Sequence, residues 1–138
     1  MSSKNNFRYS AEPEPHKLRT KQILSSNPDV RKLIGKNPFT IFPLLGLVTG
    51  MVVLSYFLKD SPWWLIILTA YLIGAFANHA LFVMIHECSH NLLFKGKALN
   101  FLASMTANLP HVLPSAVSFT RYHRMHHVHQ GNHDLDAD

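Results

Sequence analysis

The chain has 138 residues, of which 47% are hydrophobic and 15% are charged, and its formal net charge at pH 7 is +5. This length suffices for one small domain, and the apolar residues are gathered in long runs, which is typical of a membrane protein and argues against an ordinary soluble core. The single cysteine, Cys88, excludes a disulfide framework or a four-cysteine zinc ribbon within the chain.

The positive charge is concentrated in residues 1–38. Eight of the 13 Lys and Arg residues lie there together with three acidic residues, so this segment carries 8 − 3 = +5. Positive charge beside an apolar run is typical of the cytoplasmic flank of a transmembrane helix. We therefore expect a cytoplasmic N-terminal segment, and we explain the charge by membrane orientation rather than by binding of nucleic acid.

Two uncharged runs predict a transmembrane hairpin. At about 1.5 Å per residue, residues 39–58 match a hydrocarbon core roughly 30 Å thick. Residues 62–85 form the second run after the short turn KDSP, and Trp63 and Trp64 lie where an interfacial aromatic belt is expected. The hairpin returns the chain to the cytoplasmic side just before His86.

A third uncharged stretch, residues 98–119, contains Pro110 and Pro114. If this stretch crossed the bilayer, the histidines after it would lie on the opposite side from His86, and they could not share a metal site with it. We therefore expect a re-entrant or interfacial pair of helices, broken near the prolines. The predicted fold class is an all-α membrane protein: a transmembrane helical hairpin followed by re-entrant or interfacial helices that carry the histidines on the cytoplasmic side.

Nine of the ten histidines lie between residues 79 and 133, and five of these form two clusters. In HECSH, His86 and His90 are four residues apart and share one face of a helix. In RYHRMHH, the spacings of three and four residues also return to one side of a helix. Neutral imidazoles suit a transition metal, so the predicted metal ligands are His86, His90, His123, His126 and His127.

HECSH also matches the H-E-x-x-H signature of zinc proteases, in which Glu87 would be the general base. A catalytic zinc needs only three protein ligands, and the two clusters together offer five imidazoles. This surplus favours a pair of iron ions. A membrane-embedded zinc protease and a non-catalytic membrane fragment remain the alternatives.

The other histidines near these clusters have weaker predicted roles. His79 is two helical turns before His86, about 10 Å deeper in the membrane, and is either an extra ligand or a buried hydrogen-bonding residue. His111 lies between prolines and is expected to be structural. His129 and His133 are either loop residues or partners of the ligands.

The two clusters behind a helical hairpin resemble the histidine boxes of the membrane fatty-acyl desaturase and hydroxylase superfamily. The sequence around these clusters is similar to the sphingolipid delta-4 desaturases over essentially the whole chain. The segments that carry the similarity are EPEPHKLRTKQIL, NPDVRKLIGKNP, ANHALFVMIHECSHNLLF and YHRMHHVHQGNHDLDAD. The resemblance assigns His86 and His90 to the first box, and it assigns the second box to His123, His126 and His127.

The resemblance implies oxidation of the sphingoid chain of dihydroceramide to ceramide, with molecular oxygen, two non-haem iron ions and electrons from cytochrome b5. It also implies a location in the endoplasmic reticulum membrane of a eukaryote. Residues 39–138 would be part of the desaturase domain. Desaturation and C4-hydroxylation begin with the same hydrogen abstraction, so the sequence leaves both outcomes open, together with chain-length specificity and oligomeric state.

In that family, a third box of the form H-x-x-H-H lies far downstream, together with further transmembrane helices. Five ligands can hold one metal ion but do not complete a pair of iron sites. We therefore expect the 138 residues to be a fragment, or a truncated gene product, that is inactive by itself.

Overall fold

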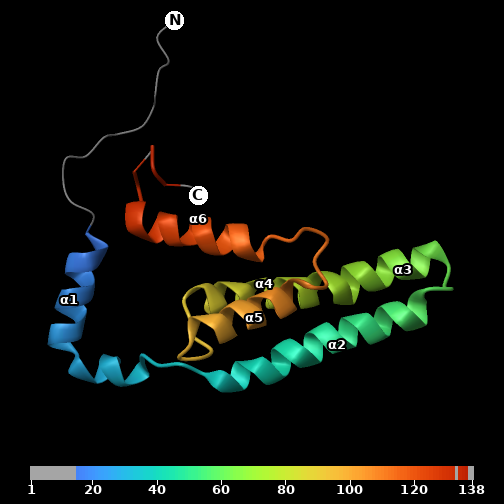
Figure 1. Ribbon diagram of the computed structural model, residues 1–138, viewed down its shortest axis with the longest axis horizontal. Coiled ribbons are helices and arrows are strands. Elements are labelled where there is room, and N and C mark those ends of the chain that lie inside the picture. Colours follow the sequence, from blue (N-terminus) through green and yellow to red (C-terminus); the bar gives the residue numbers. More distant parts are fainter. Residues whose placement is uncertain (1–14, 133, 137–138) are drawn as a thin grey trace, which may run out of the picture. The chain divides into compact units, whose positions relative to one another are not determined.

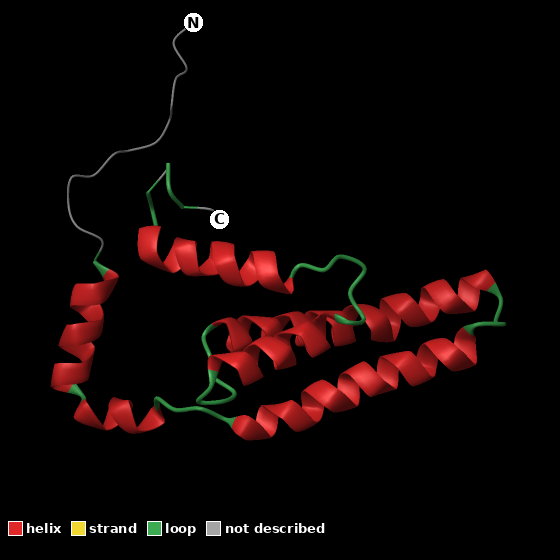
Figure 2. Ribbon diagram, viewed as in Figure 1, coloured by secondary structure: helices red, strands yellow, loops and turns green. Residues whose placement is uncertain are grey.

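The computed structural model describes residues 15–132 and 134–136, and its secondary structure in this part of the chain is helical, without strands (Figure 2). The chain divides into two compact units, Met1–Ile34 and Gly35–Asp138. The described part of the first unit contains α1 (His16–Ser26) and η1 (Pro28–Leu33), and neither helix has a buried residue. Pro28 begins η1, because proline lacks the N–H that a first turn leaves unpaired.

The second unit begins with a helical hairpin. After η2 (Pro38–Thr40), α2 (Ile41–Leu58) leads to a short turn, and α3 (Trp63–Thr69), η3 (Ala70–Gly74) and α4 (Ala75–Ser89) follow without interruption. Figure 1 shows α2 running beside α3 and α4, and α2 contacts α4. The second helix continues past the uncharged run that ends at residue 85 and reaches Ser89, so it includes His86, and His90 is the residue that caps its C-terminal end.

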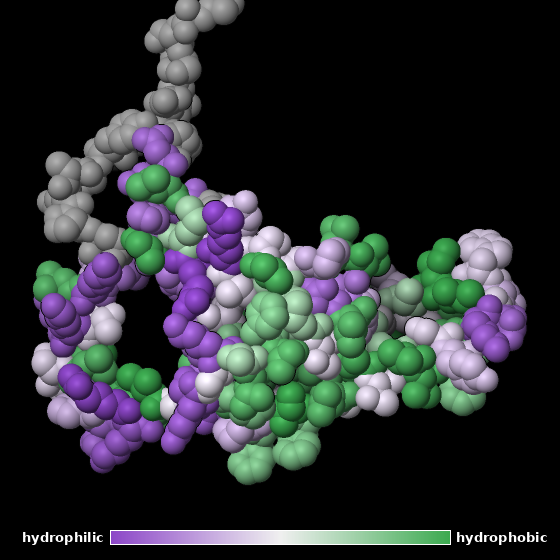
Figure 3. All heavy atoms as spheres, viewed as in Figure 1, coloured by the Kyte–Doolittle hydropathy of each residue, from purple (hydrophilic) through white to green (hydrophobic). Residues whose placement is uncertain are grey.

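The surface of this hairpin is apolar. Two stretches are long and apolar enough to cross a membrane: Pro28–Leu58, which includes α2, and Trp63–Ser89, which consists of α3, η3 and α4. Only 11% of the most apolar part of each stretch is buried. Large side chains such as Phe57 and Trp63 are each 74% exposed. Figure 3 shows the hydrophobic surface that such side chains form over these helices. Since exposing apolar area to water costs about 25 cal/mol per Å², this surface is suited to lipid.

Two further helices, α5 (Lys97–Asn108) and α6 (Ala116–His129), follow the hairpin. The chain between them is not helical, and Pro110 and Pro114 lie in this break, as the sequence predicted. Both helices contact α4, and they contact each other. The small side chains of α5 allow close packing, and the buried core is made of Leu44, Val48, Leu81, Ile85, Cys88, Leu93, Ala103, Ala107 and Ala116.

Two buried asparagines hold the connections on either side of α5. Asn100 accepts hydrogen bonds from the backbone N–H groups of Leu93 and Phe94, at 3.1 and 3.2 Å. Its amide donates to the carbonyl oxygens of Phe94 and Gly96, each at 2.8 Å. Asn100 therefore provides hydrogen-bond partners for four backbone groups in the turn between α4 and α5, which lack the partners that a regular helix would give them.

Asn108 acts across the break that precedes α6. Its side-chain oxygen accepts a hydrogen bond from the N–H of Ala116 at 2.9 Å, which pairs one of the N–H groups that a helix leaves unsatisfied at its start. Its amide donates to the carbonyl oxygen of Leu113 at 3.4 Å. Asn108 thereby links the end of α5 to the beginning of α6 and helps to set the direction in which α6 returns to α4.

The segment before α2 is attached to the loop after α4. The Lys36 ammonium donates to the carbonyl oxygen of Asn91, and the N–H of Asn37 donates to the carbonyl oxygen of Leu92 at 2.8 Å. Asn91 itself has a φ of 56°, a left-handed conformation that asparagine tolerates better than most residues. These bonds fix the loop directly after His90, at the end of the first histidine box.

Candidate metal centre

The site is built from one pair of histidines on each of two helices. His86 lies in the last turn of α4 and His90 directly follows that helix, while His123 and His127 are one turn apart on α6. Because residues four apart lie on the same face of a helix, each pair presents two imidazoles to the other helix. The contact between α4 and α6 brings the pairs together.

The Nε2 atoms of these four histidines form a compact group. His90 Nε2 lies 3.2 Å from His86 Nε2 and 2.9 Å from His123 Nε2, and His123 Nε2 lies 3.1 Å from His127 Nε2. One ligand atom from each of the four side chains lies within 4.8 Å of the others. The rings of His86 and His123 also meet edge to face across the two helices, with their centroids 4.4 Å apart.

This arrangement fits a metal ion. Nitrogen ligands that bind one ion at roughly 2.0–2.1 Å lie about 2.9–3.4 Å from their neighbours, and the three Nε2 separations given above fall in that range. A metal ligand must be the neutral imidazole. Burial, followed by electrostatic repulsion from the neighbouring His86 and His127, lowers the pKa of His90 below its ordinary value of 6.5, which favours the neutral form.

The fifth predicted ligand, His126, lies outside this group. Its ring centroid is 6.2 Å from that of His123 and 5.7 Å from that of His127. Its Nδ1 instead lies 2.7 Å from Oδ1 of Asp136, a residue that follows α6. The structure thus assembles four of the five predicted ligands and places His126 beside them against a carboxylate.

Two phenylalanines support the histidine cluster. The ring of Phe119 stacks on His123, with centroids 4.9 Å apart and planes inclined by 10°. Phe82 of α4 meets Phe119 edge to face at 4.9 Å. Such pairs contribute about 0.5–1.5 kcal/mol beyond the burial of area, so Phe119 both joins α6 to α4 and restrains the His123 ring. Its position four residues before His123 was the only signal in the sequence.

The other candidate residues are not part of the cluster. Among the described residues, the group of possible ligands does not include Glu87, whose predicted role in a zinc protease required it to face the metal. His79 is exposed on α4. His111 Nδ1 lies 3.2 Å from the carbonyl oxygen of Ala107, consistent with a structural role. His129 is the last residue of α6, and His133 lies outside the described residues.

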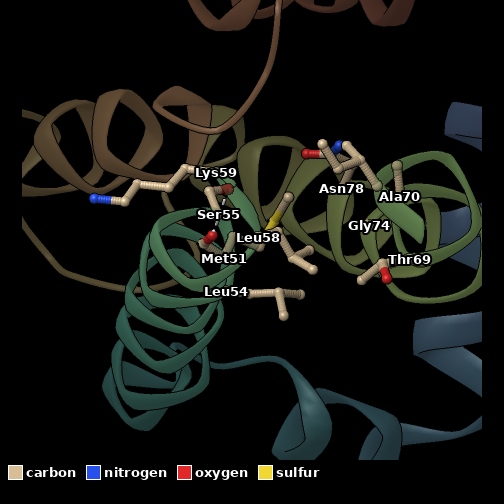
Figure 4. Close-up of a pocket in the computed structure, with 10 residues that line it drawn as sticks. Met51, Leu54, Ser55, Leu58, Lys59, Thr69, Ala70, Gly74 and Asn78 are labelled. Atoms are coloured by element: carbon tan, nitrogen blue, oxygen red, sulfur yellow. Dashed lines mark hydrogen bonds between the residues drawn. The ribbon is translucent and has the colours of Figure 1, made fainter. Parts of the chain in front are cut away.

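A cavity of ≈ 280 Å³ lies elsewhere, between α2 and the helix that begins at Trp63, beside the π-helical turn η3 (Figure 4). It contains no histidine and is therefore separate from the metal centre. Figure 4 shows side chains of α2 on one side and those of η3 and its flanks on the other. The lining residues are Met51, Leu54, Ser55, Leu58, Lys59, Ile66, Thr69, Ala70, Gly74 and Asn78.

The fold and the site define an all-α membrane protein with a histidine cluster that is able to bind a metal. A model of the fatty acid desaturase family matches residues 62–138, which include both histidine pairs, and the chain belongs to this family. A second model, that of sphingolipid Delta4-desaturase, matches residues 3–39. No solved structure matches the chain.

Curated relatives agree with both family models. The sphingolipid delta(4)-desaturase of Candida albicans is 41% identical, over 97% of this chain and 37% of its own length. The sphingolipid delta(4)-desaturase of Schizosaccharomyces pombe is 42% identical, over 96% of this chain and 37% of its own length. The Homo sapiens sphingolipid delta(4)-desaturase DES1 is 34% identical, over 99% of this chain and 43% of its own length. The chain therefore spans 37% to 43% of the length of these relatives.

Proposed function

We propose that this chain carries the first two histidine boxes of a sphingolipid delta-4 desaturase, an oxidoreductase that converts dihydroceramide to ceramide. The observation that carries the proposal is the convergence of four Nε2 atoms from α4 and α6 in a chain that matches both desaturase models. The proposed metal ligands are His86, His90, His123, His126 and His127, and the proposed cofactor is a pair of non-haem iron ions.

The iron pair, when bound, supplies the oxidising chemistry with molecular oxygen that no side chain can perform on an unactivated C–H bond. The contribution of this chain is to position the ligands. His86 and His90 are held by the end of α4, and His123 is held by the stacked ring of Phe119. Neutral imidazoles suit iron, and the single cysteine is not among the group of possible ligands.

The surroundings of the cluster suit a lipid substrate. Phe82 and Phe119 form an apolar wall beside His86 and His123. The exposed apolar surface of the hairpin would allow a sphingoid chain to approach laterally from the bilayer. Such a wall also excludes water from the reacting carbon, which protects the oxidising cofactor from side reactions.

The topology proposed for the chain places the histidine boxes on the cytoplasmic side of the endoplasmic reticulum membrane, with the N-terminus on the same side. The excess of Lys and Arg in residues 1–38 supports this orientation. On that side the cluster would be accessible to a soluble electron-carrying domain, and cytochrome b5 is the proposed donor.

Metal analysis of the detergent-purified chain tests the proposal. The protein is titrated anaerobically with Fe²⁺ and, in a separate experiment, with Zn²⁺, because imidazole ligands prefer zinc when both ions compete. The stoichiometry and affinity of each metal are measured for the wild type, His127→Ala and His79→Ala. We expect iron to bind in the wild type and in His79→Ala, which alters an exposed histidine of the same hairpin, and to fall at least tenfold in affinity in His127→Ala.

The competing functions give different results in the same experiment. Binding of one zinc per chain that is unaffected by His127→Ala, together with a proteolytic activity that Glu87→Gln abolishes, would support the protease and overturn the desaturase. Absence of stoichiometric metal from the folded wild type would support a non-catalytic fragment. Analysis of sphingolipids, in cells that express the chain with any downstream extension of its gene, then separates a delta-4 double bond from a C4 hydroxyl group.

A further inference from the structure

The carboxylate of Asp136 is held against the ring of His126. Oδ1 of Asp136 lies 2.7 Å from Nδ1 of His126, and the two side chains are 13% and 24% exposed, respectively. Asp136 comes ten residues after His126, beyond the end of α6, so the chain must reverse direction to bring them together. A pair this short and this shielded from water restrains both side chains.

The reversal depends on the turn that follows α6. Gly131 has a φ of +79°, in the left-handed region that favours glycine, and with Gln130 it forms the turn after the helix, in which the N–H of Asn132 donates to the carbonyl oxygen of His129 at 2.8 Å. The N–H of Gly131 donates to Oδ2 of Asp136 at 3.0 Å, and the N–H of Asp136 donates to the carbonyl oxygen of Asn132 at 2.8 Å. Both carboxylate oxygens are therefore engaged, one by the backbone and one by His126, and the carboxylate has a fixed orientation.

A carboxylate is an acceptor only, so the proton in this contact belongs to His126 Nδ1. Metal binding by a neutral ring protonated at Nδ1 then falls to Nε2, the same atom that His86, His90, His123 and His127 direct into the cluster. Metal-binding histidines commonly donate their other N–H to a carboxylate, which fixes the tautomer and the ring orientation.

We propose that Asp136 is a positioning residue that holds His126 in the Nδ1-protonated tautomer, so that its Nε2 serves as a metal ligand beside the four-histidine cluster. This inference rests on the proposed function, because it gives His126 the role of a ligand. Asp136 acts through His126 and does not itself bind the metal.

The most informative variant is Asp136→Asn. An asparagine has the same shape but only one oxygen, and the N–H of Gly131 requires that oxygen as its acceptor. The asparagine NH₂ group would then face His126 Nδ1 and donate to it, which forces the proton of the ring to Nε2, where metal binds. The turn keeps its backbone hydrogen bond, so a purely structural role of Asp136 predicts little effect. Asp134→Asn, in the same turn and exposed, is the matched control.

Two measurements on the purified 138-residue chain test the inference. Long-range ¹H–¹⁵N spectra of the metal-free protein, labelled at histidine, report the tautomer of His126. Titration with Co²⁺, followed by its visible d–d absorption, reports metal affinity. We expect a proton on Nδ1 in the wild type and in Asp134→Asn, and on Nε2 in Asp136→Asn. We expect Asp136→Asn to weaken Co²⁺ binding about 10–100-fold, with no further loss when it is combined with His126→Ala.

The outcomes separate this inference from the function on which it rests. A wild-type ring protonated at Nε2, or Co²⁺ affinity that is unchanged in Asp136→Asn, would overturn the role of Asp136 and leave the desaturase proposal standing. Additive losses in the double variant would also overturn it, because Asp136 would then act on the metal independently of His126. A folded wild type that binds no Co²⁺ would overturn the proposed function and this inference together.

Discussion

The Nε2 atoms of His90 and His123 lie 2.9 Å apart, although His90 directly follows α4 and His123 lies in the middle of α6. This contact is the closest of the measured Nε2 separations in the cluster, and it joins the two histidine boxes. The site therefore depends on how accurately α6 is docked on α4, and the following predictions test the residues that determine this docking.

Replacing one histidine from either box should weaken the binding of the same metal ion. We expect His90→Ala and His123→Ala each to lower Co²⁺ affinity at least tenfold, because each removes a nitrogen that converges with the others. Groups that act on one ion are not additive, so the double variant should lose less than the sum of the two free-energy changes. Isothermal titration of the three variants measures this coupling, and full additivity would show that the two residues bind separate ions.

Phe119→Ala should loosen α6. The substitution removes the ring that stacks on His123 and meets Phe82, and the half-buried position suggests a loss of about 1–3 kcal/mol in the free energy of unfolding. Metal affinity should fall as well, because the His123 ring loses its restraint. Circular dichroism during denaturant unfolding in detergent measures the first effect. Val117→Ala, at an exposed position on the same helix, is the control and should change neither property.

Asn100→Ala should destabilise the turn between α4 and α5. It removes four hydrogen bonds and leaves the N–H groups of Leu93 and Phe94 without their acceptor in a buried setting. Each buried polar group left unpaired costs about 1–3 kcal/mol. Because two N–H groups lose their acceptor, we expect the free energy of unfolding to fall by about 2 kcal/mol or more. Thermal unfolding compared with Leu99→Ala, at an exposed neighbouring position, checks this. Equal melting temperatures for the two variants would contradict it.

Asn108→Ala and Asn108→Asp should differ. The aspartate keeps an oxygen for the N–H of Ala116 at the start of α6 but loses the donor to the carbonyl oxygen of Leu113, whereas alanine loses both. A lost helix cap costs about 0.5–2 kcal/mol. We therefore expect hydrogen exchange in the first turn of α6 to rise most in the alanine variant. Overall stability does not separate the two variants, because the buried position also penalises the charge of the aspartate. Equal exchange in both variants would show that the acceptor is not important.

Much of the architecture could be predicted from local patterns. Long uncharged runs specify membrane helices because a helix satisfies its own backbone and its length must match the bilayer. Pro110 and Pro114 predicted the break between α5 and α6 for a similarly local reason, since proline removes a donor and clashes with the preceding turn. The spacing of four residues between His86 and His90 predicted that both imidazoles share one face of a helix.

The sequence by itself thus determined the hairpin, the break and the two histidine clusters, all of which depend on residues close together along the chain. Only the tertiary structure decided that His123 and His127 face the first box while His126 turns to Asp136. Spacings of three and four residues both return to one side of a helix, so the pattern could not separate the three histidines of the second box. The separation is made by the angle at which α6 packs on α4 and by the turn after α6, and both arise from contacts between distant residues.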